Sequence, residues 1–168
     1  TPLYSSAASD VYKRQDLTTV NLPLLTTVDF DAFHDCPNLV NVSLPSLVTA
    51  GNDLFQDCTS LTTVNLPLLA TVTTEAFMNC TSLVNISLPS LTTLGQSCFQ
   101  NCTSLTTVSL PVCTDLGGTV GDDLVFFGIS GNSVTLTVPT ALMTVNSGNP
   151  DGDIQYLQAN NTVTIITV

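Results

Sequence analysis

The six cysteines are the residues with the widest range of possible chemistry, because thiolates can bind metals, form disulfides and act as nucleophiles. Four of them recur at one constant interval, at Cys36, Cys58, Cys80 and Cys102. The other two, Cys98 and Cys113, fall where other copies of the same repeat carry alanine or leucine. Cys98-x-x-x-Cys102 has no second pair to complete a zinc site, and a column of parallel side chains is poor geometry for disulfides. We therefore predict six buried thiols that pack as small hydrophobic side chains, with a disulfide or a metal site as the alternatives.

His34 is the sole histidine and therefore the main candidate for a general base. The same repeat position is Gln56, Met78 and Gln100 in the following copies, which indicates a tolerant exposed loop. A Ser-His-Asp or Cys-His arrangement would need His34 at a defined site. The sequence thus predicts no catalytic residues and a protein that is not an enzyme.

Two groups of carboxylates could offer oxygen ligands to calcium. Asp29, Asp31 and Asp35 cluster near one turn, and Asp151 and Asp153 form a second pair. Neither group matches the Asp-x-Asp-x-Asp-Gly loop that binds calcium in proteins. We interpret both as solvated acidic residues and predict no metal and no cofactor.

A five-copy internal repeat must position all these side chains. Its fixed leucines are Leu17, Leu39, Leu61, Leu83 and Leu105, and its fixed prolines are Pro23, Pro45, Pro67, Pro89 and Pro111. Within each copy apolar and polar residues alternate before the proline, as in Leu61-Thr-Thr-Val-Asn-Leu-Pro67, which is typical of a short strand. This constant period predicts a solenoid with one strand per turn, stacked in parallel and in register. The inward strand residues are expected to be Val20, Val42, Val64, Ile86 and Val108.

Alternate copies differ at fixed positions, which indicates that the true repeating unit is a pair of turns. One such column runs Leu24, Ser46, Leu68 and Ser90. Another alternates Thr-Thr with Val-Asn, at residues 18–19, 40–41, 62–63, 84–85 and 106–107. Neighbouring turns are therefore not chemically identical on any face.

The chain divides into three segments. Residues 1–15 contain Asp-Val-Tyr-Lys-Arg-Gln, the translation of a transposon sequencing adaptor, so we interpret them as read-through, a genuine polar N-terminal arm being the alternative. We expect the native start, with any signal peptide, to be missing. Residues 16–123 hold the five turns, and the repeat's phenylalanine column (Phe33, Phe55, Phe77 and Phe99) ends before the fifth tail. In residues 124–168 we predict a cap with a strand over 134–139, a helix over 151–159 and a strand over 162–168, a separate attachment module being the alternative.

Charge excludes several classes of partner. Residues 16–168 contain twelve Asp or Glu and no Lys or Arg. Such a surface repels nucleic acid and anionic lipid head groups. The longest apolar runs are only a few residues, too short to span a bilayer, so we predict no membrane insertion. Abundant Thr, Ser and Asn leave a hydroxyl and amide surface that suits a protein or a neutral glycan.

The repeat resembles the leucine-rich repeat of the bacterial surface, BspA-like, type. The resemblance covers residues 16 to about 116 and is carried by Cys-Thr-Ser-Leu-Thr-Thr-Val-Asn-Leu-Pro, followed by Glu75-Ala-Phe-Met-Asn-Cys80. It implies a curved, leucine-rich-repeat-like solenoid without catalysis, in a protein that is secreted or attached to a cell surface and associated with adhesion. It implies no particular binding residue, because the motif consists of core positions.

The outward strand positions form two polar ladders, which are the candidate binding residues. They are Thr19, Asn41, Thr63, Asn85 and Thr107, and beside them Asn21, Ser43, Asn65, Ser87 and Ser109. Five strands span about 19 Å, enough for a short oligosaccharide or an extended peptide. We predict an extracellular or cell-surface recognition and adhesion module with a protein or neutral glycan ligand. The alternative is that these are solvated strand residues with no binding role.

Two further functions stay open at this point. One is a structural or receptor-binding component of a phage virion or extracellular assembly, favoured by the adaptor-like start and by a C-terminus that resembles those of phage and marine metagenomic repeat proteins. The other is an ice- or sugar-binding threonine ladder, although the alternation of Thr with Asn disfavours a uniform array. The pattern predicts no oligomeric state.

Overall fold

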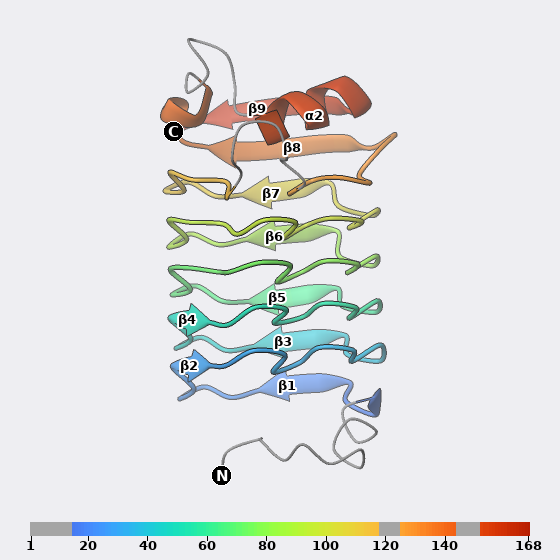
Figure 1. The fold of residues 1–168 in the computed structure, drawn as a ribbon, viewed down its shortest axis with the longest axis vertical. Coiled ribbons are helices and arrows are strands. Elements are labelled where there is room, and N and C mark those ends of the chain that lie inside the picture. Colours follow the sequence, from blue (N-terminus) through green and yellow to red (C-terminus); the bar gives the residue numbers. More distant parts are fainter. Residues whose placement is uncertain (1–14, 118–124, 144–151) are drawn as a thin grey trace.

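Each copy of the repeat forms one turn of a solenoid and contributes one short strand to a common face (Figure 1). The computed structural model describes residues 15–117, 125–143 and 152–168. The five repeat strands are β1 (Thr19–Asn21), β3 (Asn41–Ser43), β5 (Thr63–Asn65), β6 (Asn85–Ser87) and β7 (Thr107–Ser109). Of the segment that we attribute to adaptor read-through, residues 1–14 lie outside the described part of the chain.

The strands pair in parallel and in register, as predicted, within β1, β3 and β5 and again within β6 and β7, whereas β5 and β6 are not paired. Val20, Val42 and Val64 face one another across β1, β3 and β5, and Ile86 faces Val108 across β6 and β7. A second, shorter ladder joins β2 (Thr27–Val28) to β4 (Thr49–Ala50) elsewhere on the turns. It continues as single bridges from Thr49 to Thr71, Thr93 and Asp115. Each turn is therefore held to the next by backbone hydrogen bonds on more than one side.

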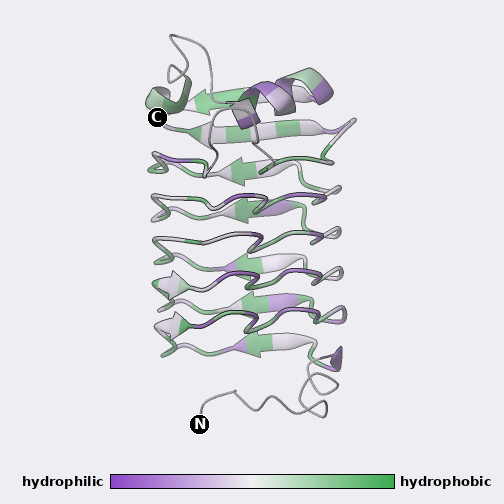
Figure 2. Ribbon diagram, viewed as in Figure 1, coloured by the Kyte–Doolittle hydropathy of each residue, from purple (hydrophilic) through white to green (hydrophobic). Residues whose placement is uncertain are grey.

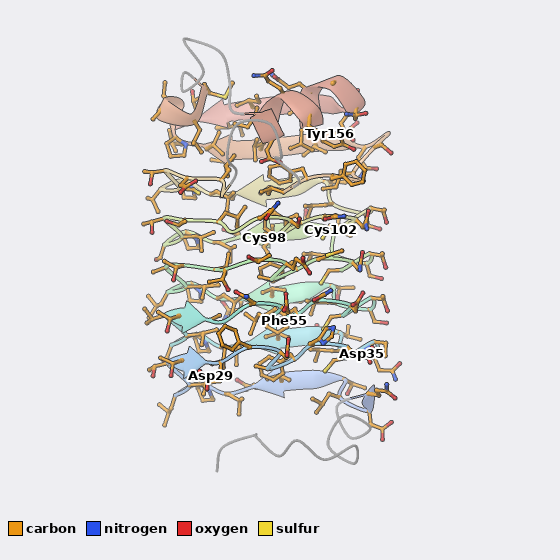
Figure 3. All side chains as sticks on the ribbon, in the orientation of Figure 1. Asp29, Asp35, Phe55, Cys98, Cys102 and Tyr156 are labelled. Carbon is orange, nitrogen blue, oxygen red and sulfur yellow. The ribbon has the colours of Figure 1, made fainter. Side chains whose placement is uncertain are left out.

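Stacked columns of apolar side chains fill the inside of the solenoid. Phe33, Phe55, Phe77, Phe99 and Phe126 form a continuous stack with ring centroids 5.4 to 5.8 Å apart. Figure 2 shows the strands with an apolar residue flanked by more polar ones, and Figure 3 shows Phe55 within the stack. Each fully buried side chain contributes roughly 1.5 to 3 kcal/mol. A single turn has no neighbour to supply this contact, so stability depends on stacking.

All six cysteines are buried, as predicted, and they do more than fill space. The thiols of Cys58, Cys80 and Cys102 donate to the carbonyl oxygens of Phe33, Phe55 and Phe77, at 3.1, 3.2 and 3.0 Å. The column thus needs a small side chain that can also donate a hydrogen bond to the preceding turn. Burial, against the opposing effect of backbone hydrogen bonds, raises the pKa of the Cys98 thiol to about 12, so this thiol stays protonated.

Two columns of non-glycine residues adopt the left-handed backbone conformation. They are Asp31, Asp53, Glu75 and Ser97, and Asp35, Asp57, Asn79 and Asn101, with φ between 52° and 60°. Asp and Asn tolerate this conformation better than other side chains, which explains their recurrence. In the second column Asn101 donates to Asn79 at 2.9 Å, and Asn79 donates to Asp57 at 2.7 Å. The next position is Gly128, with φ 82°, where a Cβ atom would come 2.2 Å from Oδ1 of Asn101.

Hydrogen bonds between turns explain the two-turn unit. The hydroxyls of Ser46 and Ser90 donate to the carbonyl oxygens of Pro23 and Pro67, at 2.7 and 2.8 Å. The leucine that alternates with these serines is exposed, to 89% at residue 24 and 50% at residue 68. Alternate turns therefore supply either a donor or an apolar side chain at one surface position.

The C-terminal segment extends the solenoid, which corrects the prediction that the array ends with the fifth copy. Strand β8 (Ser133–Val138) pairs in parallel with β7, and Phe126 stacks on Phe99. This sixth turn escaped the repeat count because Phe126 follows Phe99 at a longer interval than the one that separates the earlier phenylalanines. The predicted strands and helix are otherwise confirmed, as β8, α2 (Gly152–Asn160) and β9 (Thr162–Thr167), with a short η1 (Thr140–Met143) between them.

Helix α2 and strand β9 close the C-terminal end of the stack (Figure 1). Ile154 and Leu157 of α2 are completely buried, and the Tyr156 hydroxyl accepts the backbone N–H of Gly128 at 3.1 Å. A terminal unit of this kind covers core that would otherwise face water.

The interpretation of Asp153 as a solvated residue is wrong. Its side chain is 1% exposed and accepts the backbone N–H of Phe126 at 3.4 Å, so it joins α2 to the turn beneath. A carboxylate can be buried when it accepts hydrogen bonds from the backbone. Asp151, the other member of the pair, lies outside the described residues.

Candidate functional site

The structure brings the ten predicted binding residues together on the outward side of the repeat strands. Thr19, Asn41 and Thr63 are in register, as are Asn85 and Thr107. The neighbouring ladder follows the same register. Seven of the ten are exposed, and Ser43, Thr107 and Ser109 are half-buried. The pleat of a strand dictates this arrangement, because alternate side chains point to opposite faces.

Most of these side chains have no partner within the described part of the chain. The amide of Asn65 donates to the hydroxyl of Ser43 at 3.2 Å, and none of the other eight makes a side-chain hydrogen bond there. Threonines one position earlier behave differently: the hydroxyls of Thr62 and Thr106 donate to the carbonyl oxygens of Val40 and Val84, both at 3.2 Å. The outward ladders thus keep their donors and acceptors for solvent or a ligand.

The strand ladder is interrupted once, between β5 and β6. The three strands β1, β3 and β5 form one sheet, and β6, β7, β8 and β9 form another. Elsewhere the bonds that flank each strand pair are short, as from Val40 N to Thr18 O (2.9 Å) and from Thr106 N to Val84 O (2.8 Å). The equivalent bond from Val84 to Thr62 is missing among the described residues. Figure 1 shows β5 and β6 set further apart than the other neighbouring strands.

An open groove of about 350 Å³ lies at this interruption. It is lined by Thr62, Thr63, Val64, Asn85, Ile86, Ser87, Thr107 and Ser109. Five of these belong to the predicted ladders, and sequence reasoning missed the other three as candidate binding residues. Val64 is only partly buried, whereas the equivalent inward residues of the other four repeat strands are buried. The opening therefore exposes part of the apolar layer beneath the polar face.

The lining of the groove carries no charge, and five carboxylates lie instead in the left-handed loop columns. The imidazole Nε2 of His34 approaches Oδ2 of Asp57 at 3.5 Å, with both side chains more than a third exposed. This placement agrees with the predicted exposed loop at His34. Burial, and secondarily the charge of Asp31, raises the pKa of Asp53. Figure 3 shows Asp35 near the edge of the stack, while the lining of the groove contains no charged residue.

A second threonine column, which the sequence reasoning did not single out, follows the shorter ladder. It consists of Thr27, Thr49, Thr71 and Thr93, followed by Asp115. The repeat spacing could have revealed it, since these threonines recur with the same period as the leucines and prolines. None of its residues lines the groove, so it serves as a reference surface of similar chemistry.

Leucine columns inside, short in-register strands outside and one turn per repeat define a leucine-rich repeat protein. The chain belongs to the family of the BspA type leucine-rich repeat region, whose model matches residues 6–120 in six copies. Proteins built from such repeats are generally non-catalytic. In the described residues no helix is long and apolar enough to cross a bilayer.

Two solved structures resemble this fold. A leucine-rich repeat protein of T. pallidum is 21% identical, with a TM-score of 0.58 over 90% of this chain and 87% of the other. A leucine rich cell surface protein of Faecalibacterium prausnitzii A2-165 is 24% identical, with a TM-score of 0.52 over 85% of this chain and 39% of the other. A comparison with the curated proteins found no match.

Proposed function

We propose that this protein is a non-catalytic recognition module that presents the outward face of β1, β3, β5, β6 and β7 to a protein or a neutral glycan outside the cell. One observation carries the proposal: polar side chains lie in register along β1, β3 and β5 and along β6 and β7, and eight of the ten make no side-chain hydrogen bond among the described residues. The family and the surface protein of F. prausnitzii support a location at a cell surface.

The ligand that suits this face is neutral or cationic. The chain has a net charge of −11, and its two cationic residues both precede residue 16. Nucleic acid and anionic lipid would be repelled by this charge. Because the strand face itself carries hydroxyl and amide groups, we expect binding through short polar contacts with little dependence on salt.

An array of neutral glycans and extracellular matrix proteins tests the proposal. The parent protein is compared with a double variant, Thr63→Lys with Asn65→Lys, that places two long cations on the strand face. The control is Thr71→Lys with Thr73→Lys, which changes two exposed threonines on the second threonine column and beside it. We expect the first variant to lose binding at least tenfold and the control to bind as the parent does. Equal binding by all three proteins would remove the strand face from consideration.

A further inference from the structure

We infer that the groove between β5 and β6 is the subsite that holds one neutral sugar ring. The inference rests on the proposed function, because it specifies where on the strand face the ligand makes its closest contacts. The groove is the place where the outward face stops being a flat ladder and becomes concave. Concave sites bury more of a small ligand than flat surfaces do.

The interrupted ladder leaves backbone groups available on both sides of the groove. In the closed interfaces the N–H of the residue before a strand bonds to the preceding turn, as Val40 does to Thr18. The corresponding N–H of Val84 and carbonyl of Thr62 are not bonded to each other, and neither are the N–H of Leu66 and the carbonyl of Ser87. Backbone groups without protein partners form hydrogen bonds with water or ligand.

The side chains around the groove add both donors and acceptors without adding charge. Hydroxyls come from Thr63, Ser87, Thr107 and Ser109, and an amide comes from Asn85. The partly exposed side chain of Val64 supplies apolar contact beneath them. A sugar ring has the matching chemistry, because its hydroxyls both donate and accept while its C–H groups pack on apolar side chains.

The size of the groove distinguishes a sugar ring from an inserted peptide strand. A strand between β5 and β6 would require the two to stand about 9.6 Å apart, twice the ordinary spacing. Their Cα atoms approach within 8 Å, so β-strand addition at this place would force the solenoid apart. A volume of about 350 Å³ is at the lower end of ligand pockets, which fits a ring of monosaccharide size.

The sequence provides a matched control for this site. Thr27 and Thr49 are exposed and face each other across β2 and β4, outside the groove and outside the ten candidate binding residues. The test variant is Thr63→Val with Ser87→Ala, and the control variant is Thr27→Val with Thr49→Ala. Each pair removes two hydroxyls from the surface and leaves the inward columns unchanged.

The experiment is a titration of the isotope-labelled full chain with glucose, galactose, mannose and N-acetylglucosamine, followed by amide NMR. We expect at least one sugar to shift the amides of Val84, Asn85 and Ser87 in the parent protein. The test variant should bind that sugar at least tenfold more weakly, and the control variant should bind it within twofold of the parent. Circular dichroism confirms that all three proteins are folded.

Other results overturn the inference in distinguishable ways. If none of the four sugars moves the groove amides, the groove is not a sugar subsite, and a strand-face ligand found on the array would leave the proposed function standing. If the two variants weaken sugar binding equally, the loss is not specific to the groove, and the inference fails. If the array also shows no effect of Thr63→Lys with Asn65→Lys, the proposed function fails together with the groove.

Discussion

Two interfaces between neighbouring turns are almost identical in sequence and differ in structure. Residues 18–22 and 40–44 flank the closed interface of β1 and β3, and residues 62–66 and 84–88 flank the open interface of β5 and β6. The only difference between the two sets is that Ile86 stands where the closed interface has Val42. Strand propensity alone therefore does not decide which interface carries the ladder hydrogen bonds, and we expect packing beneath the strand to contribute.

Away from the strand face the two interfaces are alike. The phenylalanine centroids are 5.4 Å apart at the closed interface and 5.5 Å apart at the open one. A backbone bond of the second ladder region measures 2.9 Å in each, from Val48 to Thr26 and from Thr92 to Ala70. The opening is therefore local. An extra methylene group in a well-packed layer forces neighbouring atoms to move, and Ile86 supplies one directly beneath the interruption.

The largest effect should come from replacing the leucine that directly follows each of two strands, β3 and β5. Leu44, at the closed interface, is fully buried, and Leu66, beside the open one, is 1% exposed. Leucine-to-alanine changes in cores cost about 2 to 5 kcal/mol, and less where the surroundings collapse into the cavity. We expect Leu44→Ala near the upper end and Leu66→Ala near the lower end, because the groove leaves room for the strand to relax. Urea unfolding measures both.

Leu68→Ala is the control for this measurement, since Leu68 is 50% exposed and should change the free energy of unfolding by less than about 0.5 kcal/mol. A larger loss for Leu66→Ala than for Leu44→Ala would contradict the idea that the open interface is the more adaptable one.

Amide hydrogen exchange should show the next largest difference. The N–H of Val40 bonds to Thr18 at 2.9 Å, whereas the N–H of Val84 has no such bond to Thr62. Exchange requires local opening, so an amide outside the ladder exchanges close to its intrinsic rate. We expect Val84 to exchange at least about a hundredfold faster than Val40, after correction for sequence, with Thr106 as the protected control at the next closed interface. Equal protection at Val40 and Val84 would mean that the ladder is continuous in solution.

Sequence periodicity was sufficient for the fold, because the inward columns repeat at a constant interval and their burial fixes the register. It could not reveal the sixth turn, because Phe126 follows Phe99 at a longer interval than the repeat has elsewhere. It also could not reveal the groove. The outward positions of β5 and β6 resemble those of β1 and β3, so five groove residues were named as ladder positions without any sign that they surround a hollow. The one local difference is an inward isoleucine in place of valine, and periodicity does not report side-chain volume. Similarly, the cysteine column predicted burial but not the thiol hydrogen bonds to the phenylalanine carbonyls.

Exchanging the two residues that differ should transfer the opening from one interface to the other. Ile86→Val removes the extra methylene and should slow the exchange of the Val84 amide, while Val42→Ile should speed the exchange of the Val40 amide. Swaps of this size in cores change stability by less than about 1.5 kcal/mol, so both variants should fold. Exchange at Thr106 is the internal reference. If neither variant alters protection at its own interface, the side chain at this position is not the cause of the opening.

The smallest effect should come from the charges of the left-handed loops, and it tests whether electrostatics has any part in the difference. The closed interface carries two carboxylates in one loop column, Asp31 and Asp53, whereas the open interface carries Glu75 and Ser97. Repulsion between the two carboxylates would therefore favour opening at the interface of β1 and β3, which is the closed one. Burial and Asp31 raise the pKa of Asp53 above its ordinary value of 3.8, so the ionised carboxylate destabilises the fold and stability falls as the pH rises through the raised pKa. Asp53→Asn, which keeps a side chain suited to positive φ, should raise stability at pH 7 by less than about 1 kcal/mol and have no electrostatic effect below pH 3.8.

The companion change, Glu75→Gln, removes the carboxylate from the loop column of the open interface and should change stability by less than about 1 kcal/mol at pH 7. Thermal unfolding at pH 3 and pH 7 measures both variants, and hydrogen exchange at Val40 and Val84 shows whether either ladder has changed. We expect both ladders to stay as they are, because the loop columns remain bonded across the turns, for example from Asn101 to Asn79 at 2.9 Å. If Glu75→Gln instead alters exchange at Val84, or Asp53→Asn alters it at Val40, electrostatics would replace packing as the cause of the groove.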